Sequence, residues 1–356
     1  MKRTLSNRSA YWLAAGVIGL GLFASLSPSP LYRTYSVLWH FAPLTLIYAT
    51  YAFGVLATLL LAGAVSDDVG RRPTLLVALA GLMGSTALFL LADSAAWLFV
   101  ARGLQGVATG AMLSAASATL LDLHPRRDAA RVGLTNGAAA AIGIGLGMLV
   151  SSSIVQLGWE PRRLLFIALL GLIAIALAGA YRMPEPVAER KPFHLTVEWP
   201  RVPAVVRRPF VLAALAALSS WSIGALFFSL GPQLAGHLFA TTNAVVSGTG
   251  IVALAAAATA AQFLTGRTPP WIAASVGSVA LAAGMVMIVA AASADSRLLY
   301  VTGSILGGAG FGAAFLAVCA RWSRPSRRCS APPSCRRSTS SRTGRCPSRQ
   351  SSPACQ

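Results

Sequence analysis

Residues 63–73 read Gly-Ala-Val-Ser-Asp-Asp-Val-Gly-Arg-Arg-Pro, a short polar segment between two long apolar stretches at 41–63 and 74–92. Each flanking stretch is long enough to cross the ~30 Å hydrocarbon core of a bilayer as a helix, which takes about 20 residues. Within the segment, two adjacent acids are followed by two adjacent arginines. Charges gathered between two apolar helices indicate a tight turn at a membrane surface.

Apolar stretches of this kind recur along most of the chain. Ten are long enough to span a bilayer: 11–29, 41–63, 74–92, 96–121, 132–156, 164–181, 210–232, 243–264, 271–292 and 298–319. They show no alternation of polar and apolar residues, which predicts helices rather than the strands of a membrane barrel. The composition agrees, because 55% of the 356 residues are hydrophobic and 11% are charged, with a mean hydropathy of +0.66. We therefore predict an all-α, multi-pass membrane protein and exclude an ordinary soluble domain.

The basic residues predict how the chain is oriented in the membrane. The net charge of +19 would indicate nucleic-acid binding in a soluble protein, but here most basic residues lie between the spans. A cytoplasmic N-terminus places fifteen of them in inner segments, namely Lys2, Arg3, Arg8, Arg71, Arg72, Arg126, Arg127, Arg131, Arg182, Arg190, Lys191, Arg201, Arg207, Arg208 and Arg267, against Arg33, Arg162, Arg163 and Arg297 outside. Because cytoplasmic loops carry the excess of arginine and lysine, the N-terminus is expected in the cytoplasm and no nucleic-acid partner is expected. The first span also fits a cleaved signal peptide, but nine further spans favour a membrane helix.

A basic, proline-rich loop divides the spans into a group of six and a group of four. We expect a six-helix half at 1–181, a cytoplasmic linker at 182–208, a four-helix half at 209–320 and a tail at 321–356. The sequence Gly-Arg-Arg-Pro at 70–73, after the second span, is echoed by Gly-Arg-Thr-Pro at 266–269, after the eighth. Transporters are often built from two related halves of this kind.

Two motifs carry a resemblance to a known family. The segment 63–73 resembles the signature loop of the major facilitator superfamily, in which a glycine and an acid precede a glycine with two basic residues. The fourth span contains Arg102-Gly-Leu-Gln-Gly106, an arginine-then-glutamine-glycine pattern typical of the same superfamily. The resemblance covers residues 1–320 and points to the drug-exporter-like branch. It implies a major-facilitator helical bundle with a six-helix N-terminal half and an incomplete four-helix C-terminal half.

The signature loop predicts a conformational gate at the inner membrane surface. Its candidate residues are Gly63, Asp67, Gly70, Arg71, Arg72 and Asp122. Gly70 permits a positive φ, and Asp122, at the inner end of span four, lies at the depth of the arginines and is expected to pair with them. The loop departs from the family at Asp68, where a basic residue is usual. The alternative is that both arginines only follow the positive-inside rule.

Arg102 is the ionisable residue that stands inside a span, and with Gln105 and Gly106 it is a candidate coupling site. An arginine at the centre of the bilayer costs ~2.5–3.5 kcal/mol on insertion scales, so such residues usually face a cavity or a partner. The alternative is that its side chain reaches the outer surface. The resemblance implies a role in proton coupling, but no carboxylate is expected at this depth to carry the proton.

The fifth span carries glycines at Gly137, Gly143 and Gly147. The span resembles the glycine-rich motif of drug/proton antiporters, but the Gly-Pro step of that motif reads Gly143-Ile144 here. Simple helix packing through small residues is the other interpretation, and the one that we favour.

The substrate is expected near the middle of the bilayer, between the two halves. Candidate cavity residues at that depth are Ser114, Ser220, Trp221 and Ser222, with Thr109, Ser219 and Phe311 nearby. A mid-depth tryptophan either lines a cavity or packs in the core. With no charge at the midplane, an uncharged or amphipathic molecule fits best.

The tail changes composition abruptly, because the last 36 residues hold 10 Ser, 9 Arg, 5 Pro and 4 Cys. It can be read as an anionic-lipid contact, an RNA-binding tail, a disordered extension, or a shift of reading frame near residue 320. We prefer the shift of reading frame, which implies that the helical part of the transporter is truncated after the tenth helix.

The sequence as a whole predicts a secondary active transporter of the bacterial inner membrane. We expect a monomer that exports small amphipathic or drug-like molecules by alternating access, with proton coupling an open question. Uptake of a neutral solute and a non-transporting remnant are the alternatives. No catalytic triad, CxxC pair or Cys/His spacing is present, so neither an enzyme nor a metal or cofactor site is expected. The lipid bilayer and a small-molecule substrate are the expected partners.

Overall fold

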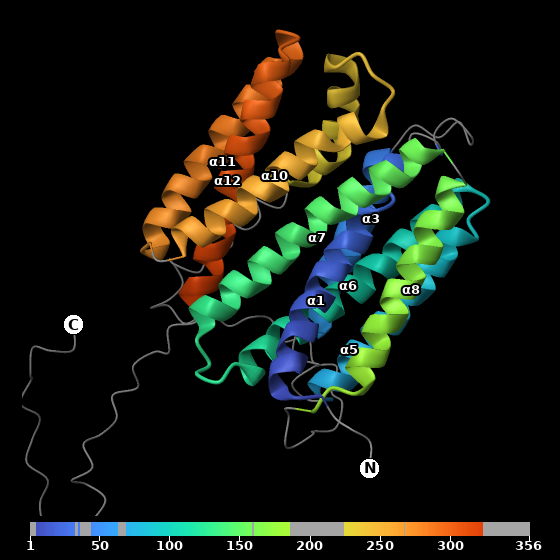
Figure 1. Cartoon of the computed structure of the whole chain (residues 1–356), viewed down its shortest axis with the longest axis vertical. Coiled ribbons are helices and arrows are strands. Elements are labelled where there is room, and N and C mark those ends of the chain that lie inside the picture. Colours follow the sequence, from blue (N-terminus) through green and yellow to red (C-terminus); the bar gives the residue numbers. More distant parts are fainter. Residues whose placement is uncertain are drawn as a thin grey trace, which may run out of the picture. The chain divides into compact units, whose positions relative to one another are not determined.

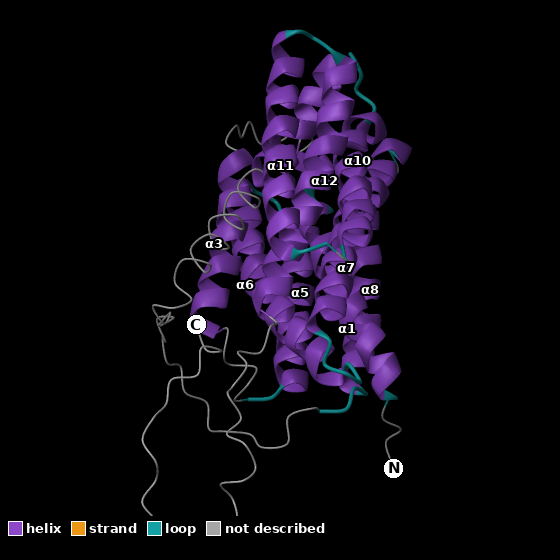
Figure 2. Cartoon of the chain, turned by 90° about the vertical axis from the view of Figure 1, so that its left-hand side faces the viewer, coloured by secondary structure: helices purple, strands orange, loops and turns teal. Residues whose placement is uncertain are grey.

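A computed structural model describes residues 5–32, 35, 44–62, 69–158, 160–185, 224–266 and 268–322, and within them it is helical without strands (Figures 1 and 2). The elements are α1 (Asn7–Leu26), the short 3-10 helix η1 (Ser29–Leu31), α3 (Leu44–Ala62), α5 (Arg71–Leu90), α6 (Ala95–Leu123), α7 (Ala129–Leu157), α8 (Pro161–Tyr181), α10 (Ala244–Thr265), α11 (Pro270–Ser293) and α12 (Arg297–Trp322). Residues 224–238 form a further helical segment. The tail from Arg324 to Gln356 lies outside the described residues.

These helices confirm the prediction of an all-α membrane protein. Among the described residues, eight helices are long and apolar enough to cross a membrane, and a shorter apolar helix covers Leu46–Leu59. One predicted boundary was wrong. The seventh span was expected to end at Pro232, but the helix continues to residue 238, because a membrane helix tolerates a proline where neighbouring groups satisfy the freed carbonyl.

Polar residues fix the first turns of several helices. Ser6 accepts a hydrogen bond from the backbone of Ser9 and begins α1. Asp128 accepts from the first turn of α7, and Asn243 does the same for α10. Each oxygen supplies an acceptor for backbone N–H groups that have no partner within the helix.

The first half packs around α1 and α6. Helix α1 contacts α6, α7 and α8, while α6 also contacts α3 and α5. Small residues such as Ala10, Ala14 and Ala115 pack with larger ones such as Leu79 and Met112 in a buried core. The backbones approach closely because alanines line the contact.

The second half repeats one packing contact of the first. A Cβ on Gly110 of α6 would lie 2.9 Å from the carbonyl oxygen of Val55 on α3, and Gly106, one turn earlier, faces Tyr51 in the same way. In the second half, Gly308 and Gly312 of α12 meet the carbonyl groups of Leu254 and Ala258 on α10. The same i, i+4 pairing in corresponding helices supports the prediction of two related halves.

The two halves meet along α7 and α10, which lie side by side (Figure 1). Gln156 Oε1, at the end of α7, accepts a hydrogen bond from the backbone nitrogen of Ala244 at 3.0 Å. Towards the other end, Gly137 of α7 faces Gln262 of α10. The contact therefore runs along most of both helices.

Candidate gating and coupling site

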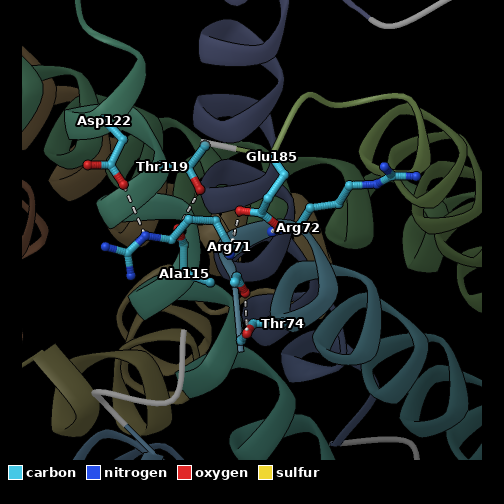
Figure 3. A network of polar contacts seen from close by, with 8 residues as sticks. Arg71, Arg72, Thr74, Ala115, Thr119, Asp122 and Glu185 are labelled. Carbon is cyan, nitrogen blue, oxygen red and sulfur yellow. Dashed lines mark hydrogen bonds and ion pairs between the residues drawn. The ribbon is translucent and has the colours of Figure 1, made fainter. Parts of the chain in front are cut away.

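The signature loop and the end of α6 form an ion pair. Arg71 Nε lies 3.0 Å from Asp122 Oδ2, and both side chains are largely buried (Figure 3). The sequence predicts that Asp122 pairs with the arginines of the loop, and the structure selects Arg71. Arg71 is the first residue of α5 and Asp122 lies in the last turn of α6, so the pair holds the ends of two neighbouring helices together.

Glu185 is a member of this charged cluster that the sequence did not predict. Its Oε1 and Oε2 accept hydrogen bonds from the backbone nitrogens of Arg71 at 3.0 Å and Arg72 at 3.1 Å (Figure 3). The carboxylate thus caps the N-terminus of α5, where the helix dipole favours a negative charge. An acid just after the sixth span, between Pro184 and Pro186, is the signal that would have revealed it.

Gly70 is required at this cap for two reasons. Its φ is +113°, a conformation that L side chains rarely adopt. A Cβ at Gly70 would also lie 2.8 Å from Glu185 Oε2. The predicted positive φ is confirmed, and the closeness of the carboxylate is an additional constraint.

Arg72 contacts the end of α8 rather than Asp122. Its Nη2 donates to the carbonyl oxygen of Tyr181, and its guanidinium lies 5.1 Å from the centre of the Tyr181 ring. Two more predicted members of the gate, Gly63 and Asp67, lie outside the described residues. The bonds described here join α5, α6 and the end of α8, all in the first half.

Arg102 is completely buried in α6, with 0% of its surface exposed. The alternative that its side chain reaches the outer surface is therefore wrong. Nη1 donates to the carbonyl oxygen of Ser25 at 2.8 Å and to Gln105 Oε1 at 2.6 Å, and Nε donates to the Tyr32 hydroxyl. Gln105 Nε2 in turn donates to the carbonyl oxygen of Ala24 at 3.0 Å.

Aromatic rings surround the Arg102 guanidinium. We call the guanidinium and these rings the Arg102 cluster. Its Cζ lies 5.3 Å from the ring centres of Tyr32 and Tyr48 and 5.6 Å from those of Tyr51 and Phe89. Within the described residues no carboxylate pairs with Arg102, and its Nη2 has no hydrogen-bond acceptor. The positive charge is held by carbonyl dipoles and ring faces.

Tyr32, which follows the α1 span, does not readily supply a negative charge to this cluster. Burial raises the pKa of its phenol above the ordinary value, although nearby Arg102 acts in the opposite direction. The hydroxyl therefore stays protonated at physiological pH.

The glycines of α7 contact two different helices. A Cβ on Gly147 would lie 2.6 Å from the carbonyl oxygen of Phe23, and Gly143 meets Gly19 in the same way, so both face α1. A Cβ on Gly137 would lie 2.7 Å from Gln262 Oε1 of α10. These positions agree with the packing interpretation.

The predicted substrate residues are only partly described. Ser114 is half-buried on α6, and Thr109 is fully buried. Phe311 of α12 packs in a small cluster with Ala141, Ala258 and Leu281, which joins both halves. Ser219, Ser220, Trp221 and Ser222 lie outside the described residues.

The family model described as Major Facilitator Superfamily matches residues 8–329 of this sequence. The chain belongs to the Major Facilitator Superfamily. Members of this family and the structural neighbours below are transporters, so this multi-pass membrane protein is classed with transporters and not with enzymes.

Curated relatives match a part of this Major Facilitator Superfamily chain. A triacylglyceride transporter from Mycobacteroides abscessus is 38% identical over 105 residues, which is 30% of this chain and 20% of the relative. A triacylglyceride transporter from Mycolicibacterium hassiacum is 32% identical over 149 residues, or 40% of this chain and 28% of the relative. The matched segment thus spans less than a third of either relative.

Solved structures show that the Major Facilitator Superfamily fold extends over most of the chain. The human organic anion transporter MFSD10 superposes with a TM-score of 0.67 at 17% identity, covering 89% of this chain and 86% of that one. A bacterial homologue of the human lysosomal transporter Spinster, in an inward-facing conformation, superposes with a TM-score of 0.67 at 15% identity. The match covers 88% of this chain and 74% of that one.

Proposed function

We propose that this transporter exports small amphipathic molecules across the bacterial inner membrane by alternating access, as a monomer with its N-terminus in the cytoplasm. The observation that carries the proposal is an apolar cluster shared by both halves. Leu22 and Leu26 of α1 and Met148 of α7 pack there against Phe227 and Phe228 of the second half. Such contacts separate without leaving a buried charge unpaired, as a rocking motion requires.

The same apolar contact supports an amphipathic substrate. When the halves separate at this cluster, its leucine, methionine and phenylalanine side chains would face the substrate, which favours ligands with a large apolar part. The partial matches to triacylglyceride transporters agree with a substrate that carries acyl chains. We therefore propose acylated, lipid-like molecules as the substrate class to be tested first.

We infer that the charged cluster of Arg71, Asp122 and Glu185 makes one end of the first half rigid. It connects the start of α5, the end of α6 and the segment after α8. Helices tied at one end move as one body, so a change at the signature loop would reach the whole half. In this proposal the cluster is the gating element, and Gly63 and Asp67 are its further members.

The Arg102 cluster is proposed as the coupling element. Arg102 and Gln105 bond to backbone carbonyls at the end of α1, while Gly106 lets α3 approach α6. The cluster therefore connects three helices of the first half near the contact with the second.

Purified protein in proteoliposomes tests the proposed function. We expect transport of a fluorescent acylglycerol at a rate above that of protein-free liposomes, and a rate that depends on an imposed pH gradient would show proton coupling. Asp122→Asn and Arg102→Ala are expected to lower the rate, whereas Glu160→Gln, which removes an exposed ion pair, should not. No transport above the protein-free rate would support the non-transporting remnant.

A further inference from the structure

A proline stands inside the helical segment 224–238, beside the contact between the halves. Pro232 has no backbone N–H, so the carbonyl group of Phe228, four residues earlier, lacks its normal helical donor. Phe228 is 7% exposed, and a buried carbonyl without a donor is costly. This position therefore requires a hydrogen-bond donor from another element.

A tyrosine of the first half supplies that donor. The Tyr48 hydroxyl of α3 lies 3.3 Å from the Phe228 carbonyl oxygen and donates to it. Ser29 Oγ also forms a hydrogen bond with the Tyr48 hydroxyl. Since the Tyr48 proton is directed to Phe228, the Ser29 hydroxyl is the donor to Tyr48, and a chain of hydrogen bonds crosses between the halves.

A second tyrosine makes a similar bond without crossing between the halves. The Tyr300 hydroxyl of α12 donates to the carbonyl oxygen of Gly231 at 3.0 Å. Both partners belong to the second half, so this bond persists when the halves separate. Tyr300 is thus a matched control for Tyr48.

Tyr48 is also a member of the Arg102 cluster. Its ring centre lies 5.3 Å from Arg102 Cζ, and its ring meets that of Tyr32 edge-on at 5.5 Å. One side chain therefore contacts both the buried guanidinium and the carbonyl that Pro232 leaves free.

We propose that Tyr48 is a positioning residue that latches the two halves together where the start of α3 meets the helical segment 224–238. It also links the Arg102 cluster to the second half. The latch forms only while the halves touch, because its donor and acceptor belong to different halves. A net hydrogen bond of ordinary strength changes the ratio of closed to open molecules about three- to tenfold. This inference rests on the proposed alternating access.

Distance measurements between spin labels test the latch. Labels at Asp93→Cys and Ala292→Cys, with the five native cysteines replaced by serine, place one probe on an exposed position of each half. We expect Tyr48→Phe to lower the closed-to-open ratio about three- to tenfold and Tyr300→Phe to leave it unchanged. In a Pro232→Ala background the effect of Tyr48→Phe should fall below about twofold, because the new N–H of residue 232 satisfies Phe228.

A thermal unfolding cycle on the wild type, Tyr48→Phe, Pro232→Ala and the double variant tests the hydrogen bond independently of transport. We expect Tyr48→Phe to lower the midpoint more in the Pro232 protein than in the Pro232→Ala protein. Equal effects of Tyr48→Phe in both backgrounds, in either measurement, would overturn the latch even if export continues. A clear difference without any export would leave the latch standing and reject the proposed function.

Discussion

The carboxylate of Glu185 caps helix α5, with its Oε1 3.0 Å from the backbone nitrogen of Arg71, although the two residues are 114 positions apart. The bond brings the segment after α8 to the start of α5. A helix N-terminus that most often uses a neighbouring residue as its cap is here completed by a distant one.

Removing the cap is expected to destabilise the first half. Glu185→Ala should lower the free energy of unfolding by about 1–2 kcal/mol, because two backbone N–H groups lose their acceptor. Glu185→Gln should have a smaller effect, since its amide oxygen still accepts a hydrogen bond without the favourable charge. Denaturant unfolding in detergent measures both. Glu160→Gln, which alters an exposed residue, is the control, and an equal loss there would contradict the cap.

The Arg71–Asp122 pair should stabilise the folded protein more than an exposed ion pair does. Its side chains are 13% and 25% exposed, whereas those of Arg163 and Glu160 are 72% and 65% exposed. A double-mutant cycle with Arg71→Gln and Asp122→Asn should give a coupling energy of about 1 kcal/mol or more, against about 0–0.5 kcal/mol for the exposed pair. Similar values for both would show that burial adds nothing to the Arg71 pair.

Lysine should not replace Arg102. The guanidinium reaches the Tyr32 hydroxyl, the Ser25 carbonyl and Gln105 together, which the compact ammonium group of lysine does not match. We expect Arg102→Lys to lower the free energy of unfolding by about 2 kcal/mol and to reduce export. Thermal unfolding and the proteoliposome assay measure the two effects. Wild-type behaviour of this variant would show that charge alone is sufficient.

Equivalent alanine substitutions should have different effects on stability at different glycines. Gly143→Ala and Gly106→Ala place a Cβ against the backbone of a neighbouring helix, and we expect a loss of about 1–3 kcal/mol. Gly16→Ala and Gly171→Ala meet nothing within 4 Å and should be neutral or stabilising by up to about 1 kcal/mol. Thermal unfolding of the four variants compares them, and a uniform loss would contradict the packing interpretation.

The sequence was sufficient for the described part of the signature loop, residues 69–73. It permits a positive φ at Gly70 and predicts that Asp122 pairs with one of the two arginines, because residue type and membrane depth limit the partners available. It did not predict Glu185, since no periodic pattern connects the end of α8 with the start of α5. The burial of Arg102 was also undecided, because its distance from the membrane surface allowed either environment.

The described spans and their helical nature follow from the sequence alone. The helical conformation of the spans has a local cause, since every backbone N–H and C=O group in hydrocarbon must form its hydrogen bond within its own segment. The tertiary structure decided which side chains complete one another, such as Tyr48 with the carbonyl that Pro232 frees and the tyrosine rings around Arg102. Those contacts depend on how helices distant in sequence approach one another, and hydropathy carries no information about that approach.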